Sequence, residues 1–364
     1  MTRILTINPG STSTKIACFD DDVCLFTESA PLSREELQKS DDTDYQLRLR
    51  KESIIETLKK HKIDAAGIDV VVGRGGALVP LRGGVYQITD LVVKHAREEI
   101  GGIKHPSNYG VQLADEICRE YNCAGYMVNP PTTDELQDVA RITGVKGIYR
   151  QSRFHTLNVK EMAIRHAKSQ GKAYEDCNYI VCHIGGGISI TAHRKGSMID
   201  GFAPVGEGPL SPTRCGELPI HDLLDYLQDG HSIKDVRNLC TKSGGFIDYF
   251  DTSDARAVWD LAQSGNRQAQ LVWDAMIYQI GKAIGAMSVV LRGEVDGILL
   301  GGGLVFSKDL VRQITEMCSF IAPVSVYPGE FEMEAMAAGA MRVQRGQEEA
   351  KLYSGEPIWS GFGA

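Results

Sequence analysis

The chain has 364 residues, of which 43% are hydrophobic and 24% charged, and its formal net charge is -8. A single hydrophobic core stops growing at roughly 250 to 300 residues, so this length predicts two domains. The negative charge disfavours a broad surface for nucleic acid or for an anionic membrane, but it leaves room for a local cationic pocket.

No stretch of the sequence approaches the roughly 20 consecutive apolar residues that cross a bilayer. The first apolar run, Ile4 to Ile7, ends at Asn8 and is far too short for the core of a signal peptide. The nine cysteines include no Cys-x-x-Cys pair, which disfavours a disulfide framework or a structural zinc site. These features predict a cytoplasmic protein.

Strand-like and helix-like segments alternate along the chain, a pattern typical of an α/β fold. The helix at residues 161–174 is rich in Ala, Lys and Arg and should end near Gly171, as helices often do at glycine. The other clear segments are strands at residues 70–72 and 179–182 and helices at residues 91–99, 271–291 and 307–318.

Two segments of the chain look alike, residues 4–17 and residues 179–192. Each has the pattern of a strand, a turn of small residues and a second strand. The similarity predicts an internal duplication with two phosphate-binding turns facing one cleft. The alternative is that two unrelated hairpins resemble each other because tight turns require Gly and Ser.

The first of these turns has the sequence Asn8-Pro-Gly-Ser-Thr-Ser-Thr-Lys15. Gly10 permits a backbone conformation that turns amides inward, and Ser11 and Ser13 add hydroxyl donors. Lys15 supplies a positive charge. The turn matches neither Gly-x-x-x-x-Gly-Lys-Ser/Thr nor Gly-x-Gly-x-x-Gly. By itself it is more typical of a solvated hairpin than of a phosphate site.

The second turn, His183-Ile-Gly-Gly-Gly-Ile-Ser189, follows a strand that reads as buried. Its bare glycine backbone would let a polyphosphate approach without meeting Cβ atoms. His183 could contribute charge near phosphates, although a lone histidine at a strand end is often a packing residue.

The third turn, within Ile298 to Lys308, has three consecutive glycines after another apolar strand. Glycine there would let an adenine ring or a ribose lie against the backbone. Ser307 is a candidate N-cap of the following helix, whose start favours nearby negative charge. Three such turns, spread over both halves of the chain, favour a nucleotide site over coincidence.

Six segments together resemble the butyrate kinases, within the acetate and propionate kinase group of the superfamily of sugar kinases, actin and heat-shock chaperone ATPases. Their order and spacing cover essentially the whole chain. The segments are Asn8 to Lys15, Val71-Val-Gly-Arg-Gly-Gly76, Phe154-His-Thr-Leu-Asn158, His183 to Gly187, Pro212-Thr-Arg-Cys-Gly-Glu217 and Gly301 to Ser307.

The resemblance implies a duplicated ribonuclease H-like fold of the actin-like ATPase type, with ATP and Mg²⁺ in a cleft between two domains. It implies an N-terminal domain at residues 1–150, completed by a C-terminal helix from about residue 334 to 347 in the tail that ends at 364. The second domain, residues 151–333, would carry the nucleotide site and a dimer surface, which makes a homodimer or higher homo-oligomer the expected state.

The resemblance also implies roles for individual residues. Arg214 matches the arginine placed near the transferring phosphoryl group and the substrate carboxylate, and His155 matches the histidine that stabilises the transition state. The remaining matches are Asn8, Ser11, Ser13 and Lys15 in the first phosphate motif, His183, Gly185 and Gly187 in the second, and Gly301, Gly302 and Gly303 in the adenosine motif, with Ser307 at its end.

Three features depart from the acetate kinase pattern. The group's His-Arg-x-x-His-Gly-Gly motif is reduced to a stretch in which Arg74 sits at a different offset and can only be a spatial substitute. The catalytic aspartate aligns with Asn129, which leaves Asp134 as the nearest candidate acid. The adenosine turn ends in Val-Phe-Ser instead of Gly-Glu-Asn.

A carboxylate acceptor is ionised at pH 7 and has no proton to lose, so phosphoryl transfer to it needs cations and positioning but no general base. Mg²⁺ takes one or two protein carboxylates and keeps several waters. Glu332 and Asn8 are the candidate metal residues, and Asp134 could hold Mg²⁺ or water. Glu332 also fits a solvated helix start, and Arg74 also fits a surface hairpin.

The predicted activity is reversible transfer of the γ-phosphoryl group from ATP to butyrate, isobutyrate or another branched short-chain acid, giving an acyl phosphate and ADP. Acetate or propionate is the nearest alternative acceptor, because one methylene changes discrimination by only about 1 to 3 kcal/mol. A sugar-type kinase would need a base poised on a hydroxyl group. A non-catalytic regulator switched by ATP is a more distant alternative.

Overall fold

The computed structural model describes residues 1–33, 42–102 and 105–362. The chain divides into two compact units: unit 1 comprises Met1–Asp134 and Phe331–Ala364, and unit 2 comprises Glu135–Glu330. The boundary predicted from the sequence followed residue 150, whereas the structure divides after Asp134. Glu135 belongs to unit 2 because its carboxylate accepts hydrogen bonds from Lys160 Nζ at 2.7 Å and from the Met198 amide at 2.8 Å.

Unit 1 is built on a six-stranded sheet with the order β3-β2-β1-β4-β6-β5. The strands are β1 Arg3–Pro9, β2 Ser13–Asp20, β3 Val23–Pro31, β4 Val70–Gly73, β5 Val85–Gln87 and β6 Ala124–Val128. The helices are α2 Thr43–Lys60, η1 Ala65–Gly67, α3 Asp90–Arg97, α4 Asn108–Tyr121 and α13 Glu332–Gln344.

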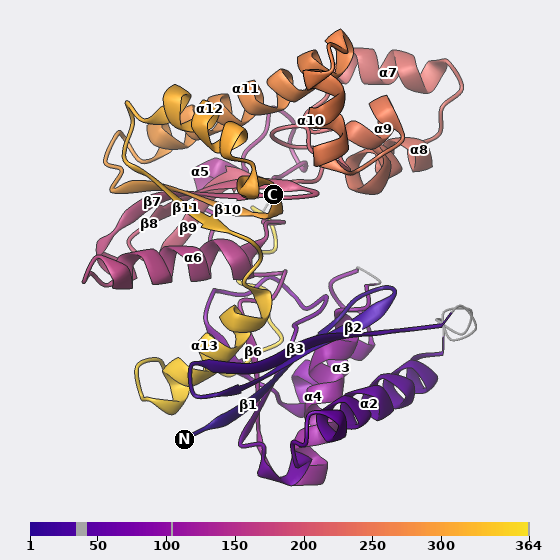
Figure 1. The fold of residues 1–364 in the computed structure, drawn as a ribbon, viewed down its shortest axis with the longest axis vertical. Coiled ribbons are helices and arrows are strands. Elements are labelled where there is room, and N and C mark those ends of the chain that lie inside the picture. Colours follow the sequence, from indigo (N-terminus) through magenta and orange to yellow (C-terminus); the bar gives the residue numbers. More distant parts are fainter. Residues whose placement is uncertain (34–41, 103–104, 363–364) are drawn as a thin grey trace. The chain divides into compact units, whose positions relative to one another are not determined.

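The main core of unit 1 lies between its sheet and helices α2 and α4. Side chains alternate along a strand, so Leu5 and Ile7 of β1 face the same side. They pack in one buried cluster with Leu47, Ile54 and Leu58, which recur at helical spacing on α2. Helix α13 packs against β1, β4 and β6 (Figure 1).

Unit 2 is built on a five-stranded sheet with the order β11-β10-β7-β8-β9. The strands are β7 Asn178–Ile184, β8 Ile188–Arg194, β9 Ser197–Phe202, β10 Gly297–Gly302 and β11 Val324–Pro328. The helices are α5 Asp138–Arg141, α6 Thr156–Ser169, η2 Tyr174–Asp176, α7 Ile220–Gln228, α8 Ile233–Asn238, η3 Leu239–Ser243, α9 Phe246–Phe250, α10 Ala255–Gln263, α11 Arg267–Val290, η4 Gly303–Phe306 and α12 Lys308–Cys318.

Helices cover both faces of the unit 2 sheet, with α11 and α12 on one face and α6 on the other (Figure 1). Strand β7 serves both layers. Ile180 and Cys182 belong to the cluster with α11 and α12, whereas Tyr179 and Val181 belong to the cluster with α6. This alternation explains why β7 reads as a continuous apolar run.

The two sheets repeat one topology, which confirms the predicted duplication. In unit 1, β1 pairs antiparallel with β2 and parallel with β4, and β4 pairs parallel with β6. In unit 2, β7 pairs antiparallel with β8 and parallel with β10, and β10 pairs parallel with β11. The two similar segments are the equivalent hairpins β1–β2 and β7–β8, and β5 is an addition to unit 1.

Most of the predicted elements are present, with shifted ends. The helix predicted at residues 161–174 begins earlier, at Thr156, and ends at Ser169, followed by Gly171 in a left-handed conformation with φ of 69°. Tyr174 belongs to the separate turn η2. In the part of the chain that the structure describes, no helix is long and apolar enough to cross a membrane.

Candidate active site

Polar residues of unit 1 gather where the parallel strands β1, β4 and β6 end. Asn8 lies at the end of β1, and Arg74 follows β4, whose Gly73 pairs with Ile7. The Arg74 amide donates to the Ile7 carbonyl at 2.8 Å, and its Nη1 donates to the Asn129 carbonyl, after β6, at 3.4 Å. The carboxyl ends of parallel strands share one edge of the sheet, so three segments distant in sequence meet there.

Glu332, the first residue of α13, contacts this edge. Asn8 Nδ2 donates a hydrogen bond to Glu332 Oε2 at 2.6 Å, and Arg74 Nη2 lies 3.9 Å from Glu332 Oε1. Burial lowers the pKa of the Arg74 guanidinium, and the negative charge of Glu332 opposes that shift. The two predicted metal residues, 324 positions apart, are therefore in direct contact, and Arg74 is no surface arginine.

The first glycine-serine turn connects β1 to β2. The Gly10 amide donates to the Ser13 carbonyl at 2.7 Å, and Asn8 lies opposite Lys15 in the ladder. Ser11 is exposed and Lys15 is half-buried, so both lie within reach of a ligand. The sequence did not identify Arg50 of α2, whose guanidinium donates hydrogen bonds to the Gly10 and Ser13 carbonyls of this turn. Its signal was an arginine at an apolar position of the helical pattern.

Asn129 and Asp134, the two residues considered for the catalytic aspartate, are both buried. Asn129 has a left-handed φ of 38°, and its Oδ1 accepts a hydrogen bond from the Gly84 amide at 2.8 Å. Its side chain therefore holds a loop. The Asp134 amide donates to the Leu81 carbonyl at 2.8 Å.

His105 is a second residue that sequence reasoning missed. Although His105 is exposed by its surface area, desolvation lowers the pKa of its imidazole, and the positive charge of Arg74 lowers it further. A neutral imidazole beside a buried guanidinium would suit an anionic ligand with a hydrogen-bonding oxygen.

In unit 2, the second predicted turn joins β7 to β8, and two histidines lie beside it. The rings of His155 and His183 stack with centroids 4.0 Å apart. His155 Nδ1 lies 2.8 Å from Ser189 Oγ, which also accepts the His155 amide at 3.2 Å. The structure thus brings together two predicted site residues, one on a strand and one at the start of α6.

Arg214 lies directly on the same turn. A Cβ added to Gly187 would come within 2.4 Å of Arg214 Nη1, so any larger residue there would push the guanidinium out of this position. Ser211 Oγ and Thr213 Oγ1 both donate to the Gly186 carbonyl, at 2.8 and 2.7 Å, which ties the arginine's loop to the turn.

The guanidinium of Arg214 has N–H donors that make no strong hydrogen bond within the described residues. Its Nη1 makes one long hydrogen bond, 3.5 Å, to the Pro204 carbonyl, and its Nε has no partner among the described residues. Burial lowers the pKa of this guanidinium. A half-buried cation with unsatisfied donors is suited to binding phosphate or carboxylate oxygens bidentately.

The third predicted turn follows β10 and leads into α12. Gly302 has a φ of 99°, and a Cβ there would come within 2.4 Å of the Ile184 carbonyl oxygen. Glycine therefore allows the end of β10 to lie against the end of β7. Ser307 caps α12, since its side chain accepts the Leu310 amide at 3.3 Å, which confirms the predicted N-cap.

A cavity of about 370 Å³ opens beside this turn. Its volume is within the range of small-ligand pockets, and aromatic and polar side chains line it together. Gly303 and Ser307 were predicted from the sequence, whereas the wall from α10 and α11 was not. The cavity is lined by Asp254, Ala255, Arg256, Trp259, Trp273, Gly303, Leu304, Phe306 and Ser307.

Comparison with known proteins gives one consistent result. The acetokinase family pattern matches residues 128–321. The chain is 41% identical to a protein of Clostridium botulinum named "Probable butyrate kinase", over 96% of this chain and 99% of that one. It is 42% identical to "Butyrate kinase 2" of Clostridium acetobutylicum, with the same coverage. The crystal structure of Porphyromonas gingivalis acetate kinase superimposes with a TM-score of 0.77 at 19% identity, over 94% of this chain and 99% of that one.

Proposed function

This chain belongs to the acetokinase family, and on that premise we propose that it transfers the γ-phosphoryl group of ATP to butyrate or to a branched four-carbon acid. The family makes it a carboxylate kinase. The choice of a four-carbon acid is carried by one observation, the 41 to 42% identity with relatives named butyrate kinases over 99% of their length.

In the proposed reaction, a carboxylate oxygen attacks the γ-phosphorus, the bond to the β-γ bridging oxygen breaks, and ADP leaves. The acceptor is already ionised, so no side chain has to remove a proton. Catalysis then depends on holding the reactants in line and on neutralising charge on the transferring oxygens. The buried cations beside the glycine turns fit that demand.

Arg214 and His155 are the proposed catalytic residues of unit 2. The spare donors of Arg214 would bind the transferring phosphoryl group, and the stacked pair of His155 and His183 would contact its oxygens. The adenine base would occupy the cavity beside Trp259 and Phe306, where it could stack on aromatic rings. The phosphates would then lie along the glycine turns.

Asn8 and Glu332 would hold a magnesium ion bound through phosphates, because the Asn8 amide donates through Nδ2 to Glu332 Oε2, which places the amide's other atom, an oxygen, and the carboxylate within one small region. Mg²⁺ takes few protein ligands when a substrate polyphosphate supplies the others. When bound, it would withdraw charge from the phosphate oxygens. Arg74 and His105 would hold the acid's carboxylate nearby, and Asp134 remains a proposed outer ligand.

The proposal is tested by incubating the protein with ATP, Mg²⁺ and acids of two to six carbons, and trapping acyl phosphate as hydroxamate. The expected result is the highest kcat/KM with butyrate or isobutyrate. Absence of hydroxamate with every acid would refute the carboxylate kinase. A clear preference for acetate or propionate would contradict the four-carbon acceptor but would still support phosphoryl transfer to a carboxylate.

We also propose a cytoplasmic homodimer formed through unit 2. Helix α7 has no buried residue, and its Ile220 and Leu224 are 75% and 50% exposed, as is Ile233 of α8 at 67%. Apolar surface of this kind is typical of subunit interfaces. Light scattering coupled to size exclusion should give twice the chain mass, and a Leu224→Glu variant should shift it toward the monomer.

A further inference from the structure

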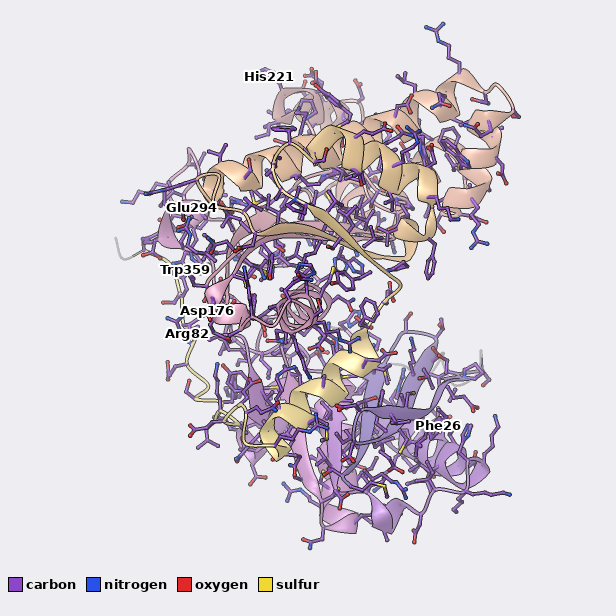
Figure 2. The ribbon with its side chains drawn as sticks, turned by 60° about the vertical axis from the view of Figure 1, so that its left-hand side comes forward. Phe26, Arg82, Asp176, His221, Glu294 and Trp359 are labelled. Carbon is purple, nitrogen blue, oxygen red and sulfur yellow. The ribbon has the colours of Figure 1, made fainter. Side chains whose placement is uncertain are left out.

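Helix α2 carries an arginine at a position where its pattern requires an apolar residue. Leu47, Ile54 and Leu58 form its buried face and pack in one cluster with Phe26 of β3, which is labelled in Figure 2. Arg50 lies between Leu47 and Ile54 on that face and is only 2% exposed. Burying a charge is costly unless its surroundings compensate, so Arg50 requires an explanation.

The explanation lies in what the guanidinium holds. Arg50 Nη2 donates to the Gly10 carbonyl at 3.0 Å, and Nη1 donates to the Ser13 carbonyl at 3.2 Å and to Thr14 Oγ1 at 2.8 Å. The two prongs therefore bind both ends of the turn that the Gly10 amide closes onto the Ser13 carbonyl. A planar fork can do this, and a single ammonium group cannot.

The charge of Arg50 is not cancelled by a carboxylate within the described part of the chain. Its hydrogen-bond acceptors are two carbonyls and a hydroxyl, and the Tyr109 ring lies 5.4 Å from Cζ. Burial lowers the pKa of this guanidinium, but arginine stays protonated in proteins. The neighbouring Lys51 differs, because its Nζ lies 2.8 Å from Glu120 of α4.

The contacts also orient the turn. The peptide bond between Gly10 and Ser11 is trans, so its carbonyl and its N–H point in opposite directions. Since the Gly10 carbonyl points to the buried Arg50, the Ser11 amide points away from it. Ser11 itself is exposed, so this amide is directed to the ligand side of the turn.

We propose that Arg50 is a positioning residue of the phosphate turn, which fixes the backbone from Gly10 to Thr14 with Ser11 facing outward and adds an uncompensated positive charge behind a bound phosphoryl group. The inference rests on the proposed function, since it assigns Arg50 to the turn that would bind phosphate. The proposal adds to the site a residue of α2 that would act on the ligand only through the turn it holds.

The first test is Arg50→Met, which keeps an unbranched side chain but removes the fork and the charge. The loss of charge-assisted hydrogen bonds predicts a fall of about tenfold to hundredfold in kcat/KM for ATP. Affinity for ATP, measured by calorimetry, should fall relative to affinity for adenosine, which has no phosphate. Lys51→Met is the matched control, because it removes the same charge one residue away, and it should retain kcat/KM within about twofold.

Two further variants keep the proposal testable if Arg50→Met does not fold. Arg50→Lys retains the charge without the fork and should lose part of the activity. Arg50→Ala leaves room for free guanidinium, which should restore kcat/KM in that variant while circular dichroism shows the same folded signal before and after addition. Wild-type kcat/KM and a wild-type ratio of ATP to adenosine affinity in folded Arg50→Met or Arg50→Lys would overturn the proposal.

Failure of the proposed function would look different. If the wild-type protein formed no hydroxamate with any acid, the carboxylate kinase would be refuted. The role of Arg50 would still be decided by the ratio of ATP to adenosine affinity in Arg50→Met, since that measurement involves no acid.

Discussion

Arg214 is held in place by a neighbour that has no side chain. Its guanidinium occupies the space where a Cβ of Gly187 would lie, 2.5 Å from Cζ. The adjacent Gly186 carbonyl accepts two hydroxyl donors from the loop that carries the arginine. The glycines of this turn thus do two things, since they expose backbone to a ligand and they seat the cation.

Gly187→Ala should therefore displace the guanidinium and lower kcat by about 10²- to 10³-fold, the loss typical when one preorganised donor is removed. The hydroxamate assay measures the rate, and thermal unfolding checks that the variant is folded. Gly285→Ala in α11 is the matched control, because a Cβ there would meet nothing within 4 Å, so kcat should stay within about twofold of wild type. Equal kcat in the two variants would argue against Arg214 as a catalytic residue.

At the scale of elements, α12 links the fold through one residue to the cavity proposed for the nucleotide. Ser307 caps the helix with its side chain and also lines the cavity beside Phe306. The cap satisfies a helix amide, while the helix start offers a favourable field to a phosphate group. The two roles can be separated by substitution.

Ser307→Ala should cost about 1 kcal/mol of unfolding free energy because the cap is lost. Ser307→Asp should keep the cap but place a negative charge at the cavity wall, so ATP affinity should fall by about tenfold while stability is retained. Ser232, the N-cap of α8, provides the control, because Ser232→Ala should lower stability without changing ATP affinity. Denaturant unfolding and calorimetry give both quantities.

The equivalent strands of the two sheets explain where the predicted turns lie. The first two predicted turns follow equivalent strands, β1 in unit 1 and β7 in unit 2, whereas the third follows β10, whose counterpart in unit 1 is β4. Asn8 pairs with Lys15 in one hairpin as His183 pairs with Ser189 in the other. Duplication therefore explains why similar turns recur in the chain.

At the scale of the whole molecule, we expect buried histidines to make the fold sensitive to acid. His193 is fully buried, and Thr191 Oγ1 donates to the Val181 carbonyl, so His193 Nε2 donates to Thr191 and Nδ1 accepts from Tyr174. Burial lowers the pKa of His193 well below its usual value, with Lys160 lowering it further, and burial also lowers the pKa of His166. The folded state therefore favours neutral imidazole.

Because the folded state favours neutral imidazole, the free energy of unfolding should decrease at low pH. Below the unfolded pKa of about 6.5, these histidines take up protons in the unfolded chain but not in the folded one. The free energy of unfolding is therefore at its full value above that pH and decreases as the pH falls below it. Each such histidine contributes a slope of up to about 1.4 kcal/mol per pH unit. The melting temperature should therefore fall between pH 7 and pH 5.

His193→Gln should flatten that slope, although it also lowers stability at neutral pH. The exposed His221 of α7, labelled in Figure 2, supplies the control, because His221→Gln should leave the slope unchanged. The comparison needs only thermal unfolding at several pH values. An identical slope in His193→Gln and wild type would contradict the assignment of acid sensitivity to this buried histidine.

Local patterns in the sequence determined the α/β class, the paired hairpins, the helix capped by Ser307 and the three glycine turns. Strand and helix periodicity, caps and turn residues act over a few neighbours, so they can be read in order along the chain. The repeated segments also predicted the duplication, which the equivalent sheets confirm.

Tertiary structure decided which side chains meet. Asn8 contacts Glu332 and Arg50 holds the Gly10 turn only because strand order and helix packing bring those segments together. The cavity wall from α10 and α11 and the seat of Arg214 on Gly187 likewise depend on close packing between elements. Such contacts join residues tens to hundreds of positions apart. A local sequence pattern covers only a few neighbours, so it cannot predict which distant residues will meet.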